Sequence, residues 1–381
     1  MRVAVMPGII NRFEFTKCDL ASDQEYSLVA YVTDHLQTIV SWGPLRITLD
    51  DKGYISLYFG DVRIITSKEP ITSAKWYTIS IEIWKDQPLP PKMPIIPHEL
   101  CYTGLKSSLK CKEIALKIKR NNNDAVVLTK PESIAWLLNV RGNDVPFTPL
   151  PLSFAILHSD EKVDWFVYSE KISKELISHI GKRVSLHSPE ELGSALDKLG
   201  KAGANVQVCP DTTSSWIYQR LSMSGANIYE FIDPVVLPKA IKNQTELSGS
   251  RAAHLRDGVA IVKFLTWLAD IMPKQNITEI SAAQKLAEFR SKGDLFRGLS
   301  FETISGSGPN GAIVHYRAKK KNCRTINKKD IFLCDSGGQY RYGTTDVTRT
   351  ICFKKQKNFI KNIFTRVLKG HIAVANTNLK K

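Results

Sequence analysis

The sequence predicts an α/β protein of two or three domains, and three observations support this fold class. Strand-type and helix-type segments alternate between residues 98 and 233, which is typical of an α/β domain. Two helices and several glycine-rich strands follow between residues 245 and 381. Five prolines lie within Pro88–Pro97, a composition that disfavours helix and central strand alike and indicates a linker between domains.

Residues 1–87 form the first predicted domain, and their apolar runs are of strand type. Val, Ile, Tyr and Thr are enriched in the runs 26–32, 38–42, 54–59, 62–65 and 76–83. Polar turn signals such as Asp50–Gly53 separate these runs. No residue in this domain suggests a particular chemistry.

Residues 98–233 form the second predicted domain, in which helices and strands alternate. Apolar spacing and N-terminal signals predict helices at 105–119, 131–138 and 214–223, and a further helix after the capping-box sequence Ser188–Glu191. Strands are predicted at 125–128, 153–157, 163–168 and 206–209, the middle two as a hairpin. Arg141 and Asp144 lie beside a turn, where a structural salt link is favoured over contact with a substrate or a partner subunit.

The third predicted domain, residues 245–381, begins with a long helix over 246–271 that Pro273 ends. Apolar residues at helical spacing predict its buried face: Val259, Val262, Leu265 and Leu268. A second helix is predicted over 278–290, with a face formed by Ile280, Ala283 and Leu286. Strands are predicted at 298–304 and 312–315, on the two sides of a glycine-rich loop.

The most informative stretch runs from Asp335 to Thr350. An apolar run and a β-branched run flank three glycines, which predicts strand, tight turn and strand, with Asp335 and Asp346 side by side. Two adjacent carboxylates cost free energy unless one is protonated or a cation lies between them. A pair of divalent ions ~3.5–4 Å apart is the usual reason to hold carboxylates together. The alternative is a polar hairpin whose two aspartates only cap turns.

These motifs resemble those of aminopeptidase P, the Xaa-Pro aminopeptidase of the pita-bread metallopeptidase family. The resemblance rests on Asp335-Ser-Gly-Gly-Gln-Tyr, Gly343-Thr-Thr-Asp-Val-Thr-Arg-Thr and the segment Ser305–Tyr316, and it extends from about Ile83 to Thr377. It implies a shortened or divergent N-terminal domain at 1–87 and a creatinase-like α/β domain at 98–233. Residues 245–381 would then be the N-terminal half of a pita-bread domain.

The resemblance also implies an activity, the metal-dependent release of the N-terminal residue from peptides with proline second. Asp335 and Asp346 correspond to two ligands of a pair of divalent ions, which would be manganese, since hard oxygen ligands suit that metal. His315 corresponds to a histidine that lies beside the metals and binds or protonates the substrate. No residue is assigned as catalytic.

The sequence departs from the family beyond Asp346. The family's dimetal site also needs one histidine and two glutamates, whereas residues 347–381 contain His371, which precedes the ligand region, and no aspartate or glutamate. With three of five ligands missing, we expect a truncated chain that is inactive alone and binds metal weakly or not at all. A C-terminal fragment would complete the site, and a homo-oligomer is possible. The alternatives are a non-catalytic relative that binds peptides or proteins, or a decayed half-domain with unpaired strand edges.

Composition argues against several other classes of protein. The formal charge is +16 at pH 7, but the lysine clusters lack interleaved aromatic residues, so we expect a solvated surface and no nucleic-acid partner. No apolar run approaches the ~18 residues of a membrane span, and we expect no signal peptide and no membrane association. Seven scattered cysteines without a CxxC pair indicate reduced thiols and a cytoplasmic location.

Overall fold

The computed structural model describes residues 89–377 and, in the first 88 residues, the backbone of seven strands. These strands are β1 (Arg2–Ala4), β2 (Tyr26–Tyr31), β3 (Thr38–Trp42), β4 (Leu45–Leu49), β5 (Ile55–Phe59), β6 (Val62–Thr66) and β7 (Trp76–Ile81). They form one sheet of order β1-β2-β7 and one of order β3-β4-β5-β6. The five predicted runs therefore correspond to β2, β3, β5, β6 and β7, whereas β1 and β4 were not predicted.

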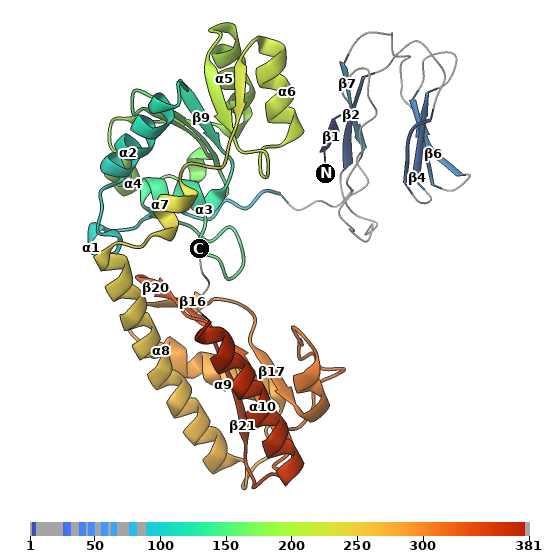
Figure 1. The fold of residues 1–381 in the computed structure, drawn as a ribbon, viewed down its shortest axis with the longest axis vertical. Helices are drawn as coiled ribbons and strands as arrows, with labels where there is room; N and C mark the ends of the chain where they lie inside the picture. The colour runs from blue at the N-terminus through green and yellow to red at the C-terminus, as the bar shows by residue number, and fades with distance from the viewer. Residues whose placement is uncertain are drawn as a thin grey trace.

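The second domain is built on a six-stranded sheet of order β13-β12-β11-β9-β14-β15 (Figure 1). The strands are β9 (Ala125–Leu128), β11 (Phe154–His158), β12 (Val163–Phe166), β13 (Val184–His187), β14 (Asn205–Val208) and β15 (Asn227–Glu230). The helices are α1 (Leu100–Thr103), α2 (Ser107–Arg120), α3 (Pro131–Leu138), α4 (Lys174–Ile180), α5 (Leu192–Lys201), α6 (Ser215–Ser224) and α7 (Val236–Ala240). Strand β8 (Ile96–Pro97) pairs with β10 (Val140–Arg141) in a separate ribbon. The predicted hairpin is confirmed, because β11 and β12 are antiparallel.

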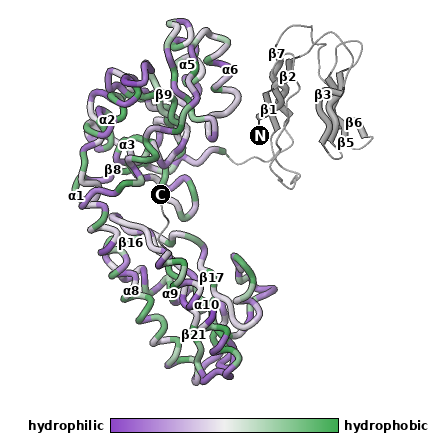
Figure 2. The backbone as a smooth tube through the Cα atoms, viewed as in Figure 1, coloured by the Kyte–Doolittle hydropathy of each residue, from purple (hydrophilic) through white to green (hydrophobic). Residues whose placement is uncertain are grey.

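Strand β9 is buried on both faces because its alternate residues reach two apolar clusters. Val126 and Leu128 pack in the cluster that includes residues of α2 and α3, and Ala125 and Val127 pack in the cluster that includes residues of α5 and α6. The strand lies in a hydrophobic part of the domain (Figure 2). The continuous apolar sequence of the strand thus follows from its place between two helical layers.

Three α-helices and two three-stranded sheets form the described part of the third domain. Helices α8 (Gln244–Ile271) and α9 (Glu279–Ser291) begin at capping boxes formed by Asn243 and Thr278. One sheet has the order β16-β19-β20 and the other β17-β18-β21. The strands are β16 (Phe296–Leu299), β17 (Ile304–Ser307), β18 (Ile331–Ser336), β19 (Gly338–Tyr340), β20 (Gly343–Thr344) and β21 (Val347–Cys352), and helix α10 (Asn358–Ala375) comes last. Among residues 89–377, no helix is both long and apolar enough to cross a membrane.

The buried face of α8 differs from the predicted one. Val259 and Val262 are 49% and 63% exposed, whereas Asp257 and Phe264 are fully buried. Leu268 is buried, as predicted. The prediction failed because Asp257, which forms a buried ion pair with Arg290, occupies part of the buried face of α8. Apolar spacing alone therefore pointed to a neighbouring face of the helix.

Helix α9 shows the same effect. Ile280 and Ala283, which were predicted for the buried face, are only half-buried. The fully buried positions are Glu279, Ala282, Leu286 and Arg290. Two of these four residues are charged, and a pattern of apolar residues could not have selected them.

The two strands predicted around the glycine-rich loop are also different. The segment 298–304 is broken, because β16 ends at Leu299 and β17 begins at Ile304 in the other sheet. Residues 312–315 are not a strand, because Gly308–Ala312 forms a 3₁₀ helix, η3, and a turn follows. Pro309 stands at the start of η3, where its fixed φ favours a helical turn over an extended chain.

Candidate metal centre

Asp335 and Asp346 lie on neighbouring antiparallel strands. Asp335 is the fifth residue of β18 and pairs with Thr348 of β21, and Asp346 immediately precedes β21. Asp346 lies two residues before Thr348, just outside β21, and is therefore next to the end of β18 that carries Asp335. The strand register therefore brings near each other the backbone positions of the two aspartates that the sequence singled out.

The connection between the two aspartates is more elaborate than the predicted tight turn. The chain leaves β18 at Gly337, forms β19 and β20 in the second sheet, and returns as β21. A Cβ atom at Gly337 would lie 1.9 Å from the carbonyl oxygen of Thr345 and 2.2 Å from Ser300 Oγ. Glycine is therefore required for the backbone to cross between the sheets at this point.

The chemistry of Asp335 fits a cation. Its side chain is half-buried, and its Oδ1 atom is buried without a hydrogen-bond partner among the described residues. Such an unsatisfied acceptor costs about 1–3 kcal/mol. A divalent ion prefers oxygen ligands and would provide the missing partner. Asp346 is exposed, and no group of three or more ligating side chains that could hold a metal ion occurs in the described part of the chain.

His315 lies in a turn and not at the end of a strand, the position that the sequence predicted. It stands in the turn after η3 with a φ of 52°, and its side chain is exposed. The hydrogen bonds and ion pairs of the described residues do not join it to Asp335 or Asp346. The loop that carries His315 begins after Ser307 of β17, and Ser307 pairs with Phe332 of β18. Phe332 precedes Asp335 by three residues, which corresponds to roughly 10 Å along the strand.

The loop that carries His315 is anchored by Glu279, a fully buried carboxylate that sequence reasoning missed. It accepts hydrogen bonds from the backbone N–H of Ser307 at 2.7 Å and of Arg324 at 2.9 Å. The Tyr316 hydroxyl donates to it at 2.8 Å, and burial with this bond raises the pKa of that phenol. The available signal was an acidic residue in the first turn of a helix, where the helix dipole favours negative charge.

Glu279→Gln is expected to lower the free energy of unfolding by about 1–3 kcal/mol, because the amide nitrogen cannot accept from the donors that surround it. Urea denaturation followed by circular dichroism measures this change. Glu288→Gln is the matched control on the same helix. The Glu288 side chain is exposed and accepts hydrogen bonds from Lys285 and Lys292, and its backbone carbonyl accepts from the Ser291 hydroxyl. Equal losses in the two variants would contradict the anchoring role.

A buried ion pair lies beside the candidate centre. The Arg290 guanidinium donates to both carboxylate oxygens of Asp257, at 2.7 and 2.9 Å, and to Ser336 Oγ at 3.1 Å. The Tyr340 hydroxyl donates to Asp257 at 2.9 Å. This network joins α8, α9, β18 and β19, and it holds the strand end that carries Asp335.

The prediction of a salt link is confirmed for Asp144 but is wrong for Arg141. Asp144 is buried and accepts from Lys171 Nζ at 2.5 Å and from the Leu152 N–H at 2.7 Å. Arg141 has no ion-pair partner among the described residues, and its guanidinium donates a hydrogen bond to the carbonyl oxygen of Val140 at 3.0 Å. Arg141 instead lines a cavity between the second and third domains.

Comparison with known families gives two matches that together span residues 86–380. The creatinase/prolidase N-terminal domain matches residues 86–246, and metallopeptidase family M24 matches residues 248–380. A probable Xaa-Pro aminopeptidase P of Aspergillus niger is 37% identical over 302 residues, which are 77% of this chain and 49% of the relative. The Xaa-Pro aminopeptidase ApepP of Drosophila melanogaster is 39% identical over 302 residues, 78% of this chain and 49% of the relative. The chain thus spans about half the length of the curated relatives it matches.

Solved structures agree with these matches. A Caenorhabditis elegans X-prolyl aminopeptidase, described as a cytosolic enzyme with a di-nuclear active site, has a TM-score of 0.72 and 34% identity over 77% of this chain and 49% of that chain. A Xaa-Pro dipeptidase from Bacillus anthracis has a TM-score of 0.56 at 18% identity, over 70% of both chains, and supports the fold alone. The predicted mixed fold and family are confirmed. The chain belongs to the pita-bread metallopeptidases of family M24, with a creatinase-type domain before its metallopeptidase residues.

Proposed function

We propose that this chain is the part of a metal-dependent Xaa-Pro aminopeptidase that contributes the two aspartate ligands. Its substrates are peptides with proline second, from which the N-terminal residue is released. The observation that carries the proposal is the strand register that pairs Asp335 with Thr348 and so sets Asp346 beside it. Its similarity to Xaa-Pro aminopeptidases over 77% of its length supports the same activity.

Asp335 and Asp346 would hold two divalent ions in this proposal. We propose manganese because carboxylate oxygens suit that metal. When bound, the ions supply an acidified water and polarise the scissile carbonyl. The exposed imidazole of His315 has no hydrogen-bond partner among the described residues, so it is free to donate to the substrate carbonyl as negative charge develops there.

The remaining ligands come from outside residues 1–381 in this proposal. Two aspartates cannot neutralise two divalent ions, and residues 347–381 add no further carboxylate. Helix α10 is evidence for a further segment that packs against it, because none of the helix residues is buried. Its exposed apolar side chains include Phe359, Ile363, Phe364, Val367, Leu368 and Ile372. A contiguous exposed apolar surface of this kind marks an interface.

A non-catalytic, peptide-binding relative is the second candidate. It is favoured by the finding that residues 89–377 hold no group of three or more ligating side chains placed for a metal ion. It would use the same loop and His315 to bind peptides without cleaving them. The cytoplasmic location and the homo-oligomer remain our predictions. The cysteines of the described residues are free thiols, and Cys111, Cys209 and Cys334 among them are buried.

The test joins residues 1–381 to the C-terminal continuation of the Drosophila relative and compares this chimera with the unextended chain. We expect the chimera to release arginine from Arg-Pro-Pro in manganese and to leave Arg-Ala-Pro uncleaved, while the unextended chain is inactive. Calorimetric titration with manganese measures metal binding in both proteins. A chimera that melts cooperatively but binds no metal would favour the non-catalytic relative.

A further inference from the structure

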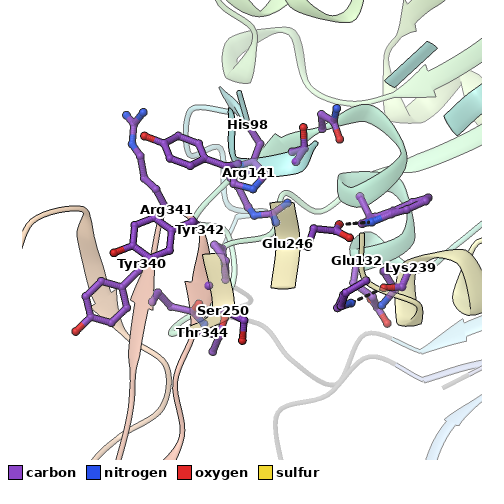
Figure 3. A pocket seen from close by; sticks show the side chains of 18 of the residues that line it. His98, Glu132, Arg141, Lys239, Glu246, Ser250, Tyr340, Arg341, Tyr342 and Thr344 are labelled. Carbon is purple, nitrogen blue, oxygen red and sulfur yellow. Dashed lines mark hydrogen bonds between the residues drawn. The ribbon is translucent and has the colours of Figure 1, made fainter. Parts of the chain in front are cut away.

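A cavity of about 530 Å³ lies between the creatinase-type domain and the metallopeptidase residues. Side chains from both parts of the chain converge on it (Figure 3). One wall comes from α1, α2, α3 and β10 of the creatinase-type domain, and the opposite wall comes from α8 and the β19–β20 segment. Neither Asp335 nor Asp346 lines it, so the cavity is separate from the candidate metal centre. Its volume falls within the range of about 300–1,000 Å³ that small-molecule sites occupy.

The walls of this cavity carry an excess of positive charge. Five basic side chains line it, against the carboxylates of Glu132 and Glu246: Lys110, Arg141, Lys239, Lys242 and Arg341. Within the described part of the chain, Arg341 is paired with Glu99 at 3.0 Å, and the other four basic residues have no ion-pair partner. Burial lowers the pKa of the remaining basic residue, His98, to about 3, so its ring is neutral at pH 7.

Lys110 is the deepest of these cations, at 1% exposure. Its Nζ donates to Asn139 Oδ1 at 2.7 Å and to the Trp136 carbonyl oxygen at 3.0 Å, and it lies 3.9 Å from the centroid of the Trp136 ring. All three partners are neutral. A buried ammonium without a counter-ion is costly, and burial accordingly lowers the pKa of Lys110 to about 8.

Arg141 provides a second under-used cation at the same wall. Its guanidinium has five donors, and the structure gives it one hydrogen bond, to the Val140 carbonyl oxygen. Burial lowers the pKa of Arg141 to about 10. The nearby Glu246 carboxylate is already engaged, since it accepts from Trp136 Nε1 at 3.1 Å and from the Asn243 N–H at 2.9 Å. The free donors of Arg141 are thus available to a ligand.

We propose that this cavity binds an organic anion whose carboxylate or phosphate oxygens are held by Lys110 and Arg141. Lys242 stands at the exposed rim and adds long-range attraction. The rings of Tyr102 and Trp136 offer flat apolar surface to the rest of the ligand. Because both domains contribute to the walls, the ligand would also fix the domains relative to each other. This site does not depend on the metal centre or on the proposed aminopeptidase activity.

The affinity is expected to depend on pH through Lys110. The ammonium form attracts the anion, so affinity is highest at neutral pH and falls as the pH rises above about 8, where the free protein loses this proton. The charged and titratable groups around Lys110 are Glu246, Arg141, Cys111 and Lys242. Of these, Cys111 has its pKa raised to about 11 by burial, so it remains a neutral thiol through this range. The decline in affinity should disappear in Lys110→Met.

Calorimetric titration and thermal melting of the 381-residue protein test the proposal with four probes: citrate, pyrophosphate, Arg-Pro-Pro and Arg-Pro-Pro amide. We expect an anion to bind and raise the melting temperature. Binding of the peptide acid but not of its amide would identify a carboxylate ligand, and tighter binding of pyrophosphate would identify a phosphate ligand. If no probe binds to the wild-type protein, the proposal is wrong.

Single-residue variants distinguish a specific binding site from a general attraction of anions to the positively charged protein. Arg141→Met and Lys110→Met are each expected to weaken binding by about tenfold or more, the loss of one charge-assisted hydrogen bond. Because Lys110→Met also removes buried hydrogen bonds and can impair folding, Arg141→Lys and the rim variant Lys242→Met provide milder, measurable losses. Lys162→Met is the matched control, since Lys162 is an exposed lysine away from the cavity. An equal loss of affinity in Lys162→Met would overturn the proposal.

Discussion

Arg290→Met is expected to lower the free energy of unfolding by about 3–5 kcal/mol, because it leaves the buried Asp257 carboxylate without its counter-ion. Both side chains are fully buried. The hydrogen bonds to Ser336 and Tyr340 tie this pair to the two strands on either side of Gly337. We therefore expect the loss to appear as lower stability of the whole third domain rather than as local fraying.

A matched surface pair separates burial from geometry. Arg220 also binds a carboxylate in a two-pronged manner, with 2.8 and 2.7 Å bonds to Asp197, but these side chains are 38% and 32% exposed. Arg220→Met should therefore cost at most about 1 kcal/mol, since exposed ion pairs are screened by water. Urea denaturation of the two variants under the same conditions makes the comparison. Similar losses would show that burial does not dominate.

Removing both charges provides a second check on the same ion pair. In Asp257→Leu/Arg290→Met no buried charge is left unpaired, so stability should recover in part relative to Arg290→Met. The recovery is incomplete because the Tyr340 hydroxyl still loses its acceptor. A double variant that is less stable than the single variant would mean that lost packing, and not the stranded charge, causes the damage.

Local signals in the sequence were sufficient for most of the secondary structure. The capping box at Ser188 and the short apolar run of β9 depend on residues a few positions apart, and both occur as predicted. The pairing of β18 with β21 also followed from local features, because apolar and β-branched runs flank a short glycine-rich segment. The family motifs then singled out Asp335 and Asp346 within that pairing.

Long-range polar contacts explain what the sequence did not predict. Asp257 looks like a surface residue of a helix until Arg290, 33 positions later, is placed against it. Lys110 likewise resembles any helical lysine, and its burial depends on Asn139, 29 positions away. Periodicity assigns such residues to the exposed face, so the buried faces of α8 and α9 and the cationic cavity were found only in the folded chain.

Asp346→Asn in the metal-complete chimera is expected to lower kcat/KM for Arg-Pro-Pro by about 10³-fold. A bound divalent ion contributes several kcal/mol to transition-state stabilisation, and each 1.4 kcal/mol corresponds to about tenfold in rate. Asp335→Asn should have a comparable effect, because both carboxylates hold the same pair of ions in our proposal. Manganese titration of the folded variants should show the corresponding loss of metal affinity.

Two further variants decide whether such a loss belongs to the metal centre. Asp330→Asn makes the same chemical change just before β18, where Asp330 contacts Arg324 at 3.5 Å, and should leave both activity and metal affinity nearly unchanged. His315→Gln should lower kcat by about 10²-fold, as loss of a proton-donating group does, but should leave manganese binding intact. Full manganese affinity in Asp346→Asn would mean that the strand register sets two aspartates side by side for a reason other than metal binding. Because the histidine turn and the aspartate strands are held by separate buried networks, through Glu279 and through Asp257, the two classes of variant should fail independently.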